Sequence, residues 1–357
     1  MRIASLFAAG IAAAAAAPGS GPAADSHAIA EVRLLAGGRG RLPGVRWRLT
    51  DVGSPEVAAA LTGSDVLVWV AARTDLQAQA HGRPTDRRAA LLRTGRALVV
   101  SAAALGVGHV VVVTSAEVFG ALPDNPVPLP DDAPLSAVVD EGAVGDLLAV
   151  EAFVEESRVN HHNVRFTVLR PAVLVGEGVD TALTRYFEAP RLLAVRGARP
   201  TWQFCHLDDL ASAVRRVVTL KAGPSMPVAT VGCQGHLDLG QVEQLTAMRR
   251  IEVGETTATA TAAQLYRVGV LRNPASELAY VMHPWAVGSS TLRAYGWQPA
   301  YDNETCLGVL LEAIADRHAR PGHRFDRPDR RDAALGAASA GVALVATAAL
   351  LRRARRH

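Results

Sequence analysis

The sequence predicts an α/β fold with a doubly wound parallel sheet and a smaller C-terminal α/β subdomain. Two observations carry this prediction: runs of continuous Val and Leu, and helix-like segments between them. Continuous apolar runs are typical of parallel strands buried on both faces. Their alternation with helices requires right-handed crossover connections. The runs lie at residues 31–36, 65–72, 109–115 and 164–176, and the clearest helical segments at 86–106 and 145–158.

The chain has 357 residues, of which 49% are apolar, so it is long enough for one large or two modest domains. We expect a first domain over 1–176 and a smaller subdomain, interleaved with it, over 177–316. A polar linker over 317–332 and a hydrophobic helix with a basic tail over 333–357 follow. The segment 121–136 contains five prolines and is predicted to be a loop.

The opening segment MRIASLFAAGIAAAAAA, residues 1–17, allows three interpretations. A secretory signal would explain the single arginine, the apolar stretch and the small residues before Asp25. An alanine-rich helix is the second interpretation, and a first strand followed by a degenerate nucleotide-binding loop is the third. The third is favoured, because cleavage of a signal would remove the central strand of the predicted sheet.

Charge is distributed unevenly along the chain, whose formal net charge is +3. Residues 317–357 hold ten Arg and three Asp, so the preceding part is net acidic. That distribution argues against a nucleic-acid-binding domain. The three cysteines show no CxxC spacing, which supports neither a disulfide framework nor a metal site and favours a reducing, cytoplasmic compartment.

Residues 333–351 form a run of nineteen uncharged residues between DRRD and RRARRH. At 1.5 Å per residue, such a helix matches a bilayer core of about 30 Å, and flanking arginines suit headgroups. The alternative is an alanine-rich helix docked on the domain. We expect a membrane contact here.

Four segments occur in a specific order: GVGHVVVVTSAEVFGA (106–121), LRPAVLVGEGVD (169–180), QFCHLDDLASAV (203–214) and STLRAYGWQPAYD (290–302). With them the chain resembles the extended short-chain dehydrogenases/reductases, the NAD-dependent epimerase/dehydratase family, over about residues 1–315. The resemblance implies a Rossmann-like domain over 1–176, NAD or NADP as cofactor, a nucleotide-sugar ligand and a homodimer formed through two helices.

The family's glycine-rich loop falls on the opening segment. An ungapped comparison places its three glycines on Phe7, Gly10 and Ala13. Gly10 would let the backbone approach a pyrophosphate, and Ala13 is an accepted substitute where the helix packs on the strand. Phe7 replaces the glycine of the tight turn, so the resemblance implies weakened or lost cofactor binding.

Further cofactor contacts follow from the same resemblance. The acidic residue that the family carries after the second strand is replaced here by Gly37 or Gly38. Arg39 or Arg41 could bind the 2′-phosphate of NADP. A solvated loop is the simpler interpretation of these two arginines. The remaining positions that the resemblance assigns to the cofactor are Asp51, Val52, Ala71, Ala72, Thr114, Pro171, Ala172 and Val173.

The family's catalytic residues are largely missing. The serine is present as Ser115, but the tyrosine and lysine of YxxxK fall on Ala143 and Leu147, which cannot transfer a proton. None of the five tyrosines has a lysine four residues later, and Lys221 is the only lysine.

Carboxylates near the missing dyad are candidates for a substitute acid or base, although residues at a helix start more often serve the helix dipole. These carboxylates are Asp140, Glu141 and Asp146. The resemblance also implies that His206, Asp208 and Asp209 hold the fold together. It assigns nucleotide-sugar contacts to Thr184, Arg185, Gln203 and Arg293, for each of which a purely structural role is the alternative.

Two functional hypotheses follow. The first is an atypical family member that binds a dinucleotide or a nucleotide sugar with its hydride chemistry impaired or lost, acting as a sensor, scaffold or partner subunit. The second is an active epimerase, dehydratase or reductase that uses a substituted acid/base. An exported protein with a signal peptide is a third, less favoured hypothesis.

Overall fold

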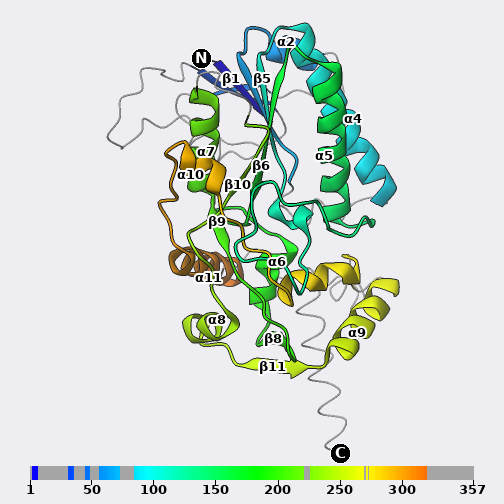
Figure 1. Cartoon of the computed structure of the whole chain (residues 1–357), viewed down its shortest axis with the longest axis vertical. Helices are drawn as coiled ribbons and strands as arrows, with labels where there is room; N and C mark the ends of the chain where they lie inside the picture. Colours follow the sequence, from blue (N-terminus) through cyan, green and yellow to red (C-terminus); the bar gives the residue numbers. More distant parts are fainter. Residues whose placement is uncertain are drawn as a thin grey trace, which may run out of the picture.

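The computed structural model describes residues 2–6, 31–35, 45–48, 56–72, 84–220, 226–268, 271 and 273–319. A seven-stranded parallel sheet forms the upper part of the molecule in Figure 1. Its strand order is β10-β6-β5-β4-β1-β2-β3. The strands are β1 (Arg2–Leu6), β2 (Glu31–Leu35), β3 (Val45–Arg48), β4 (Val66–Val70), β5 (His109–Val113), β6 (Arg165–Pro171) and β10 (Val228–Val231).

This sheet confirms the predicted fold class. The first strand lies between β4 and β2, which is the central position expected for residues at the very start of the chain. The last strand, β10, comes from the C-terminal half and pairs with β6, so the two parts of the chain are interleaved. No pattern in the sequence indicated β3 or the short helix α2 (Glu56–Leu61).

Helices cover both faces of the sheet. On one face lie α2, α4 (Pro84–Ala104) and α5 (Ala143–Asn160), packed on Leu67, Trp69 and Val112 (Figure 1). On the other face lies α7 (Leu207–Thr219), which packs on the alternate residues Val111 and Val113. Both sets of strand residues are almost fully buried because the strands are apolar on both sides.

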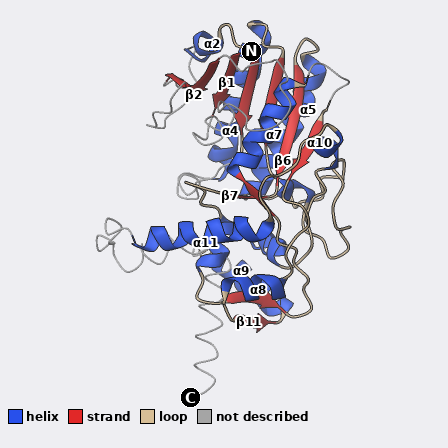
Figure 2. Ribbon diagram, turned by 90° about the vertical axis from the view of Figure 1, so that its left-hand side faces the viewer, coloured by secondary structure: helices blue, strands red, loops and turns tan. Residues whose placement is uncertain are grey.

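The C-terminal part lies beyond the carboxyl ends of the strands, below the sheet in Figure 2. Two small parallel sheets build it, β7 (Val173–Val175) with β9 (Phe204–His206) and β8 (Leu192–Val195) with β11 (Arg250–Val253). An aromatic cluster of Tyr186, Phe187, Trp202 and Phe204 forms its core. Its helices are α6 (Ala182–Arg185), α8 (Leu239–Thr246), α9 (Glu255–Arg267), α10 (Ser290–Ala294) and α11 (Asn303–Ala319), with the 3-10 turn η3 (Ala275–Val281).

Several predicted features lie outside the described residues. They are the glycine loop with Gly10 and Ala13, the pair Asp51 and Val52, and the apolar run 333–351. Among the helices that the structure describes, none is long and apolar enough to cross a membrane.

Packing of α4 on the sheet predicts the effect of Gly95→Ala. A Cβ at Gly95 would lie 2.5 Å from Cη2 of Trp69 and 3.0 Å from Cε1 of Phe153. Trp69 is 1% exposed and lies edge-on to Phe153, so both rings resist displacement. We expect the free energy of unfolding to fall by about 1–3 kcal/mol, despite the better helix propensity of alanine.

Urea unfolding would measure that loss, with Gly308→Ala as the matched control. Gly308 lies within α11, and a Cβ there would meet nothing within 4 Å, so this variant should gain up to about 1 kcal/mol. A gain of stability in both variants would contradict the packing described for Gly95.

Candidate functional site

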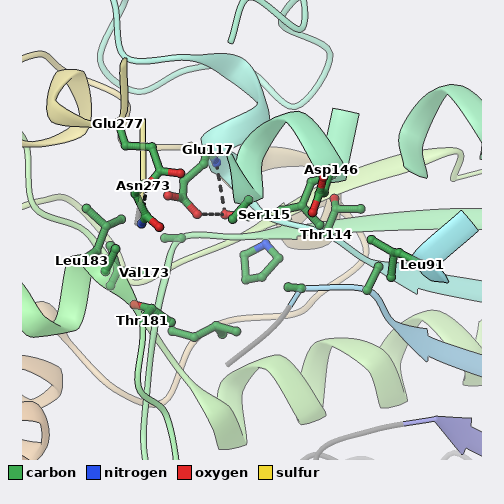
Figure 3. A pocket seen from close by; sticks show the side chains of 18 of the residues that line it. Leu91, Thr114, Ser115, Glu117, Asp146, Val173, Thr181, Leu183, Asn273 and Glu277 are labelled. Atoms are coloured by element: carbon green, nitrogen blue, oxygen red, sulfur yellow. Dashed lines mark hydrogen bonds between the residues drawn. The ribbon is translucent and has the colours of Figure 1, made fainter. Parts of the chain in front are cut away.

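A pocket opens at the carboxyl ends of β4, β5 and β6, where they meet the C-terminal part (Figure 3). Open α/β sheets commonly bind ligands at this edge. The first residues of α5 form one wall, and α6 and the segment before η3 close the pocket from the C-terminal side. The lining residues are Ala71, Ala72, Arg87, Leu91, Thr114, Ser115, Glu117, Ala143, Asp146, Leu147, Pro171–Leu174, Thr181–Leu183, Asn273 and Glu277.

The structure brings together the described residues that the sequence assigned to the cofactor. Small side chains follow β4 at Ala71 and Ala72, and the apolar Leu91 of α4 lies beside them. Pro171, Ala172 and Val173 line the wall after β6. The described positions that the resemblance assigned to the cofactor therefore line one pocket.

Ser115 and the two positions of the missing dyad line the same pocket. The Ser115 hydroxyl donates a hydrogen bond of 2.9 Å to Glu117 Oε2 and also accepts one from the Glu117 backbone. Ala143 and Leu147, one turn apart on α5, present a methyl and an isobutyl group. The residue that the resemblance assigned to the catalytic serine thus lines the pocket, and the two residues at its tyrosine and lysine positions carry no titratable group.

Thr114 is turned toward the protein interior rather than toward a ligand. Its hydroxyl donates a hydrogen bond of 2.8 Å to Glu151 Oε1. Glu151 also accepts two hydrogen bonds from Arg170, at 3.0 and 2.6 Å, and both side chains are buried. The Arg170 guanidinium lies over the Phe119 ring. This buried ion pair joins α5 to β6, and the Thr114 hydroxyl after β5 is engaged in it.

Asp146 is held by two arginines and is not a free acid or base. Its carboxylate accepts hydrogen bonds from Arg87 at 2.5 Å and from Arg88 at 3.0 Å. Asp140 accepts hydrogen bonds from the Gly142 backbone and from the Ser276 hydroxyl, and it thereby fixes the segment before α5. The side chains of Asp140 and Asp146 therefore stabilise the helix start rather than carry a proton for a substrate.

Two carboxyl groups that the sequence analysis did not select lie beside Ser115. They are Glu117, in the 3-10 turn after β5, and Glu277, in η3 (Figure 3). Asn273 Nδ2 donates to Glu277 Oε2 at 2.5 Å, and Tyr280 donates to the Glu117 carbonyl at 2.6 Å. Spacing could have pointed to Glu117, two residues after Ser115. Glu277 comes from a distant part of the chain, and no local motif marks it.

Burial shifts the titration of both groups. It raises the pKa of Glu277 to about 8, and the nearby Glu117 and Asp140 carboxylates add to this rise. Burial likewise raises the pKa of Glu117, opposed by the hydrogen bond from Ser115. At neutral pH the Glu277 carboxyl therefore carries a proton that an exposed glutamate would have released.

This shift predicts a pH-dependent stability that Glu277→Gln removes. The folded chain keeps the Glu277 proton up to about pH 8, whereas an unfolded chain releases it near 4.5. The folded state therefore binds more protons, and its stability falls as pH rises between these values. We expect Glu277→Gln to gain about 1–3 kcal/mol relative to the wild type between pH 5 and pH 9.

Thermal unfolding measured across that pH range would show this gain. The melting temperature of Glu277→Gln should rise relative to that of the wild type as pH increases. Glu255→Gln is the control, because Glu255 is an exposed glutamate at the start of α9. Parallel profiles for the wild type and Glu277→Gln would contradict the raised pKa.

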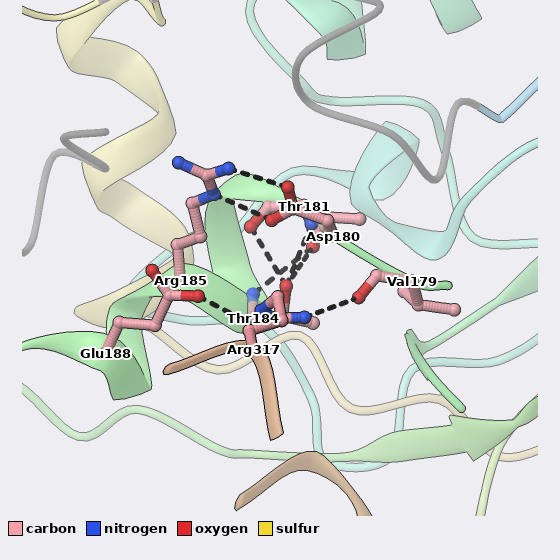
Figure 4. A network of polar contacts seen from close by, with 7 residues as sticks. All are labelled: Val179, Asp180, Thr181, Thr184, Arg185, Glu188 and Arg317. Carbon is pink, nitrogen blue, oxygen red and sulfur yellow. Dashed lines mark hydrogen bonds and ion pairs between the residues drawn. The ribbon is translucent and has the colours of Figure 1, made fainter. Parts of the chain in front are cut away.

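The four positions assigned to a nucleotide sugar do not share one site. Thr184 caps α6 together with Thr181, and Arg185 makes a two-pronged ion pair with Asp180 (Figure 4). Gln203 is buried and bonds the backbone of Cys233 and Val287. All three residues therefore make contacts within the protein, and the pocket is lined instead by Thr181–Leu183, at the start of α6.

Arg293 lies in a separate depression with Gln234 and residues 298–302. Asp209 accepts hydrogen bonds from the backbone of Ala300 and Tyr301, and so joins α7 to the segment before α11. His206 caps α7 through Asp208 N. These contacts agree with the structural role expected for the HLDD segment.

The cysteines are buried free thiols, and Sγ of Cys233 lies 3.6 Å from Sγ of Cys306. Within the described ranges, no group of three or more His, Cys, Asp or Glu residues could hold a metal ion.

A model of the NAD dependent epimerase/dehydratase family matches residues 26–232. An uncharacterized protein of Mycobacterium tuberculosis is 26% identical over 193 residues, which are 54% of this chain and 50% of that protein. The alignment thus spans about half the length of this curated relative.

Solved structures show the same fold at low sequence identity. A UDP-glucuronic acid 4-epimerase from Bacillus cereus in complex with NAD has a TM-score of 0.64 at 12% identity, covering 89% of this chain and all of that chain. A UDP-glucose 4-epimerase from Thermotoga maritima with UDP-glucose has a TM-score of 0.61 at 12% identity, with the same coverage.

Proposed function

The chain belongs to the NAD dependent epimerase/dehydratase family, and from that premise we propose that its pocket binds a dinucleotide and a nucleotide sugar without the family's tyrosine–lysine proton transfer. One observation carries the proposal. Ala143 and Leu147 line the pocket beside Ser115, so the reacting centre keeps its serine and lacks its acid/base pair. The protein would then act as a sensor, a scaffold or the partner subunit of an enzyme.

Support for cofactor binding comes from the shape of the apolar end of the pocket. Ala71, Ala72 and Leu91 form an apolar surface beside which an adenine–nicotinamide dinucleotide can pass. A bound NAD would supply a hydride acceptor at the wall formed by Pro171–Val173. Ser115 would hydrogen-bond a sugar hydroxyl, while Arg87 stays paired with Asp146 at the mouth.

The proposal is tested by titrating the full chain with NADH and NADPH and following energy transfer from the tryptophans. Binding in the micromolar to millimolar range, strengthened by UDP-glucose, is expected. A chain that binds neither nucleotide at millimolar concentration would overturn the proposal.

A second candidate function is an active epimerase, dehydratase or reductase with a carboxyl pair in place of the dyad. Glu117 and Glu277 favour it, because a carboxyl with a pKa near 8 is suited to general acid/base work at neutral pH. Ser115 already bonds Glu117 at 2.9 Å, so a substrate hydroxyl on Ser115 would lie near that carboxylate. Turnover of a UDP- or dTDP-sugar that disappears in Glu117→Gln would select this candidate.

A further inference from the structure

Two consecutive arginines in the first turns of α4, Arg87 and Arg88, lie against the start of α5 and share one carboxylate. Asp146 accepts hydrogen bonds from Nε of Arg87 at 2.5 Å and from Nε of Arg88 at 3.0 Å. The carbonyl of Glu141 accepts from Nη2 of Arg87, and the carbonyl of Asp140 accepts from Nη2 of Arg88. The two guanidinium groups are therefore held in the same way, but of the two only Arg87 lines the pocket.

The third nitrogen of the Arg87 guanidinium remains available to a ligand. Nη1 makes no hydrogen bond to a described residue and is not sealed from solvent, and the side chain is 13% exposed. A guanidinium is planar and rigid, so bonds at Nε and Nη2 also fix the direction of the two donors on Nη1. Arg87 thus presents a preorganised pair of donors at the pocket wall.

Positive charge at this wall exceeds what its carboxylate neutralises. The two guanidinium groups share the single carboxylate of Asp146. The Asp140 carboxylate bonds a backbone N–H and a hydroxyl elsewhere, and the Glu141 side chain is exposed. Among the described lining residues Arg87 is the cationic one, whereas Leu147 occupies the position that the resemblance assigns to lysine. The cation of the pocket is therefore supplied by α4 rather than by α5.

Two further carboxyl groups line the pocket, and burial weakens their negative charge. Burial raises the pKa of Glu277 to about 8, so this group keeps its proton at neutral pH. Burial also raises the pKa of Glu117, whose carboxylate accepts the hydrogen bond from Ser115. An anionic ligand group beside Arg87 therefore meets less opposing charge than the number of carboxyl groups implies.

We propose that Arg87 is a ligand-binding residue whose Nη1 donates hydrogen bonds to an anionic phosphate oxygen of a bound nucleotide. This inference rests on the proposed function, because it takes the ligand to be a dinucleotide or a nucleotide sugar, both of which carry a diphosphate. A hydrogen bond from a guanidinium to a phosphate is charge-assisted and about twice as strong as a neutral one. The fixed direction of Nη1 adds to its strength, because little side-chain entropy is lost when the ligand binds.

The test is calorimetric titration of the full chain with NADH, UDP and UDP-glucose, for the wild type, Arg87→Met and Arg88→Met. Arg88→Met is the matched control, because each variant removes one guanidinium from Asp146 and from a backbone carbonyl of residues 140–141. We expect Arg87→Met to weaken binding by about tenfold or more, and Arg88→Met to bind like the wild type. A loss confined to NADH places the phosphate contact on the dinucleotide, and a loss for UDP and UDP-glucose places it on the nucleotide sugar.

Equal affinities of the two variants for every nucleotide would overturn the inference, while binding by the wild type still upheld the proposed function. A wild type that binds none of the three nucleotides would overturn both. If Arg87→Met does not fold, modification of the wild type with phenylglyoxal, mapped by mass spectrometry, decides the question. A saturating nucleotide should slow the modification of Arg87 but not that of Arg88 or of the exposed Arg250. An unchanged rate at Arg87 would contradict the proposed contact.

Discussion

Arg170→Met is expected to lower the free energy of unfolding by about 3–5 kcal/mol, the largest loss we expect from a single substitution. The substitution leaves the Glu151 carboxylate buried without the two hydrogen bonds that Arg170 now donates. The Asp131 carbonyl and the Phe119 ring lose a contact as well. An unpaired buried charge costs far more than the pair itself contributes, which is why a single replacement should be severe.

Chemical denaturation would measure this loss, with Arg250→Met as the matched control. The Arg250 side chain is 47% exposed and pairs with Glu243 and Glu252 at the surface, so its removal should cost under about 1 kcal/mol. Adding Glu151→Leu to Arg170→Met should recover part of the stability, because it removes the stranded charge. Similar losses of unfolding free energy in the Arg170 and Arg250 variants would contradict the larger contribution expected of the buried ion pair.

Ala143→Trp is expected to weaken binding of NADH and of UDP-sugars at least tenfold. Ala143 lines the pocket at the start of α5, opposite the wall after β6, so an indole there fills the space that a ligand needs. Ala152→Trp lies nine residues further along the same helix at an exposed position outside the pocket, and it should bind like the wild type. Unchanged affinity in both variants would place the ligand elsewhere.

The fold could be predicted because its cause is local. The run Val110–Val113 is apolar at every residue, which is typical of a parallel strand covered on both faces. Because Ser115 comes two residues after this run, its position at the carboxyl end of β5 could also be predicted. The short strand β3 and the helix α2 were missed because only four and six residues form them.

Other parts of the site arise from contacts between distant segments. The Glu117–Glu277 pair joins two turns that are far apart in the chain, and the Glu151–Arg170 pair joins α5 to β6. Gln203 and Arg185 were assigned to a ligand from their place in a family pattern. Their side chains instead satisfy backbone groups and Asp180, which only the packed structure reveals.

We propose a ligand pocket that lacks the tyrosine–lysine pair needed for proton transfer. The most direct test is to incubate the full chain with NAD and UDP-glucose, at concentrations that saturate binding, and to separate the sugar nucleotides by chromatography. We predict that UDP-glucose is recovered unchanged after many hours. Formation of an epimerised, dehydrated or oxidised UDP-sugar that is lost in Ser115→Ala would contradict this proposal.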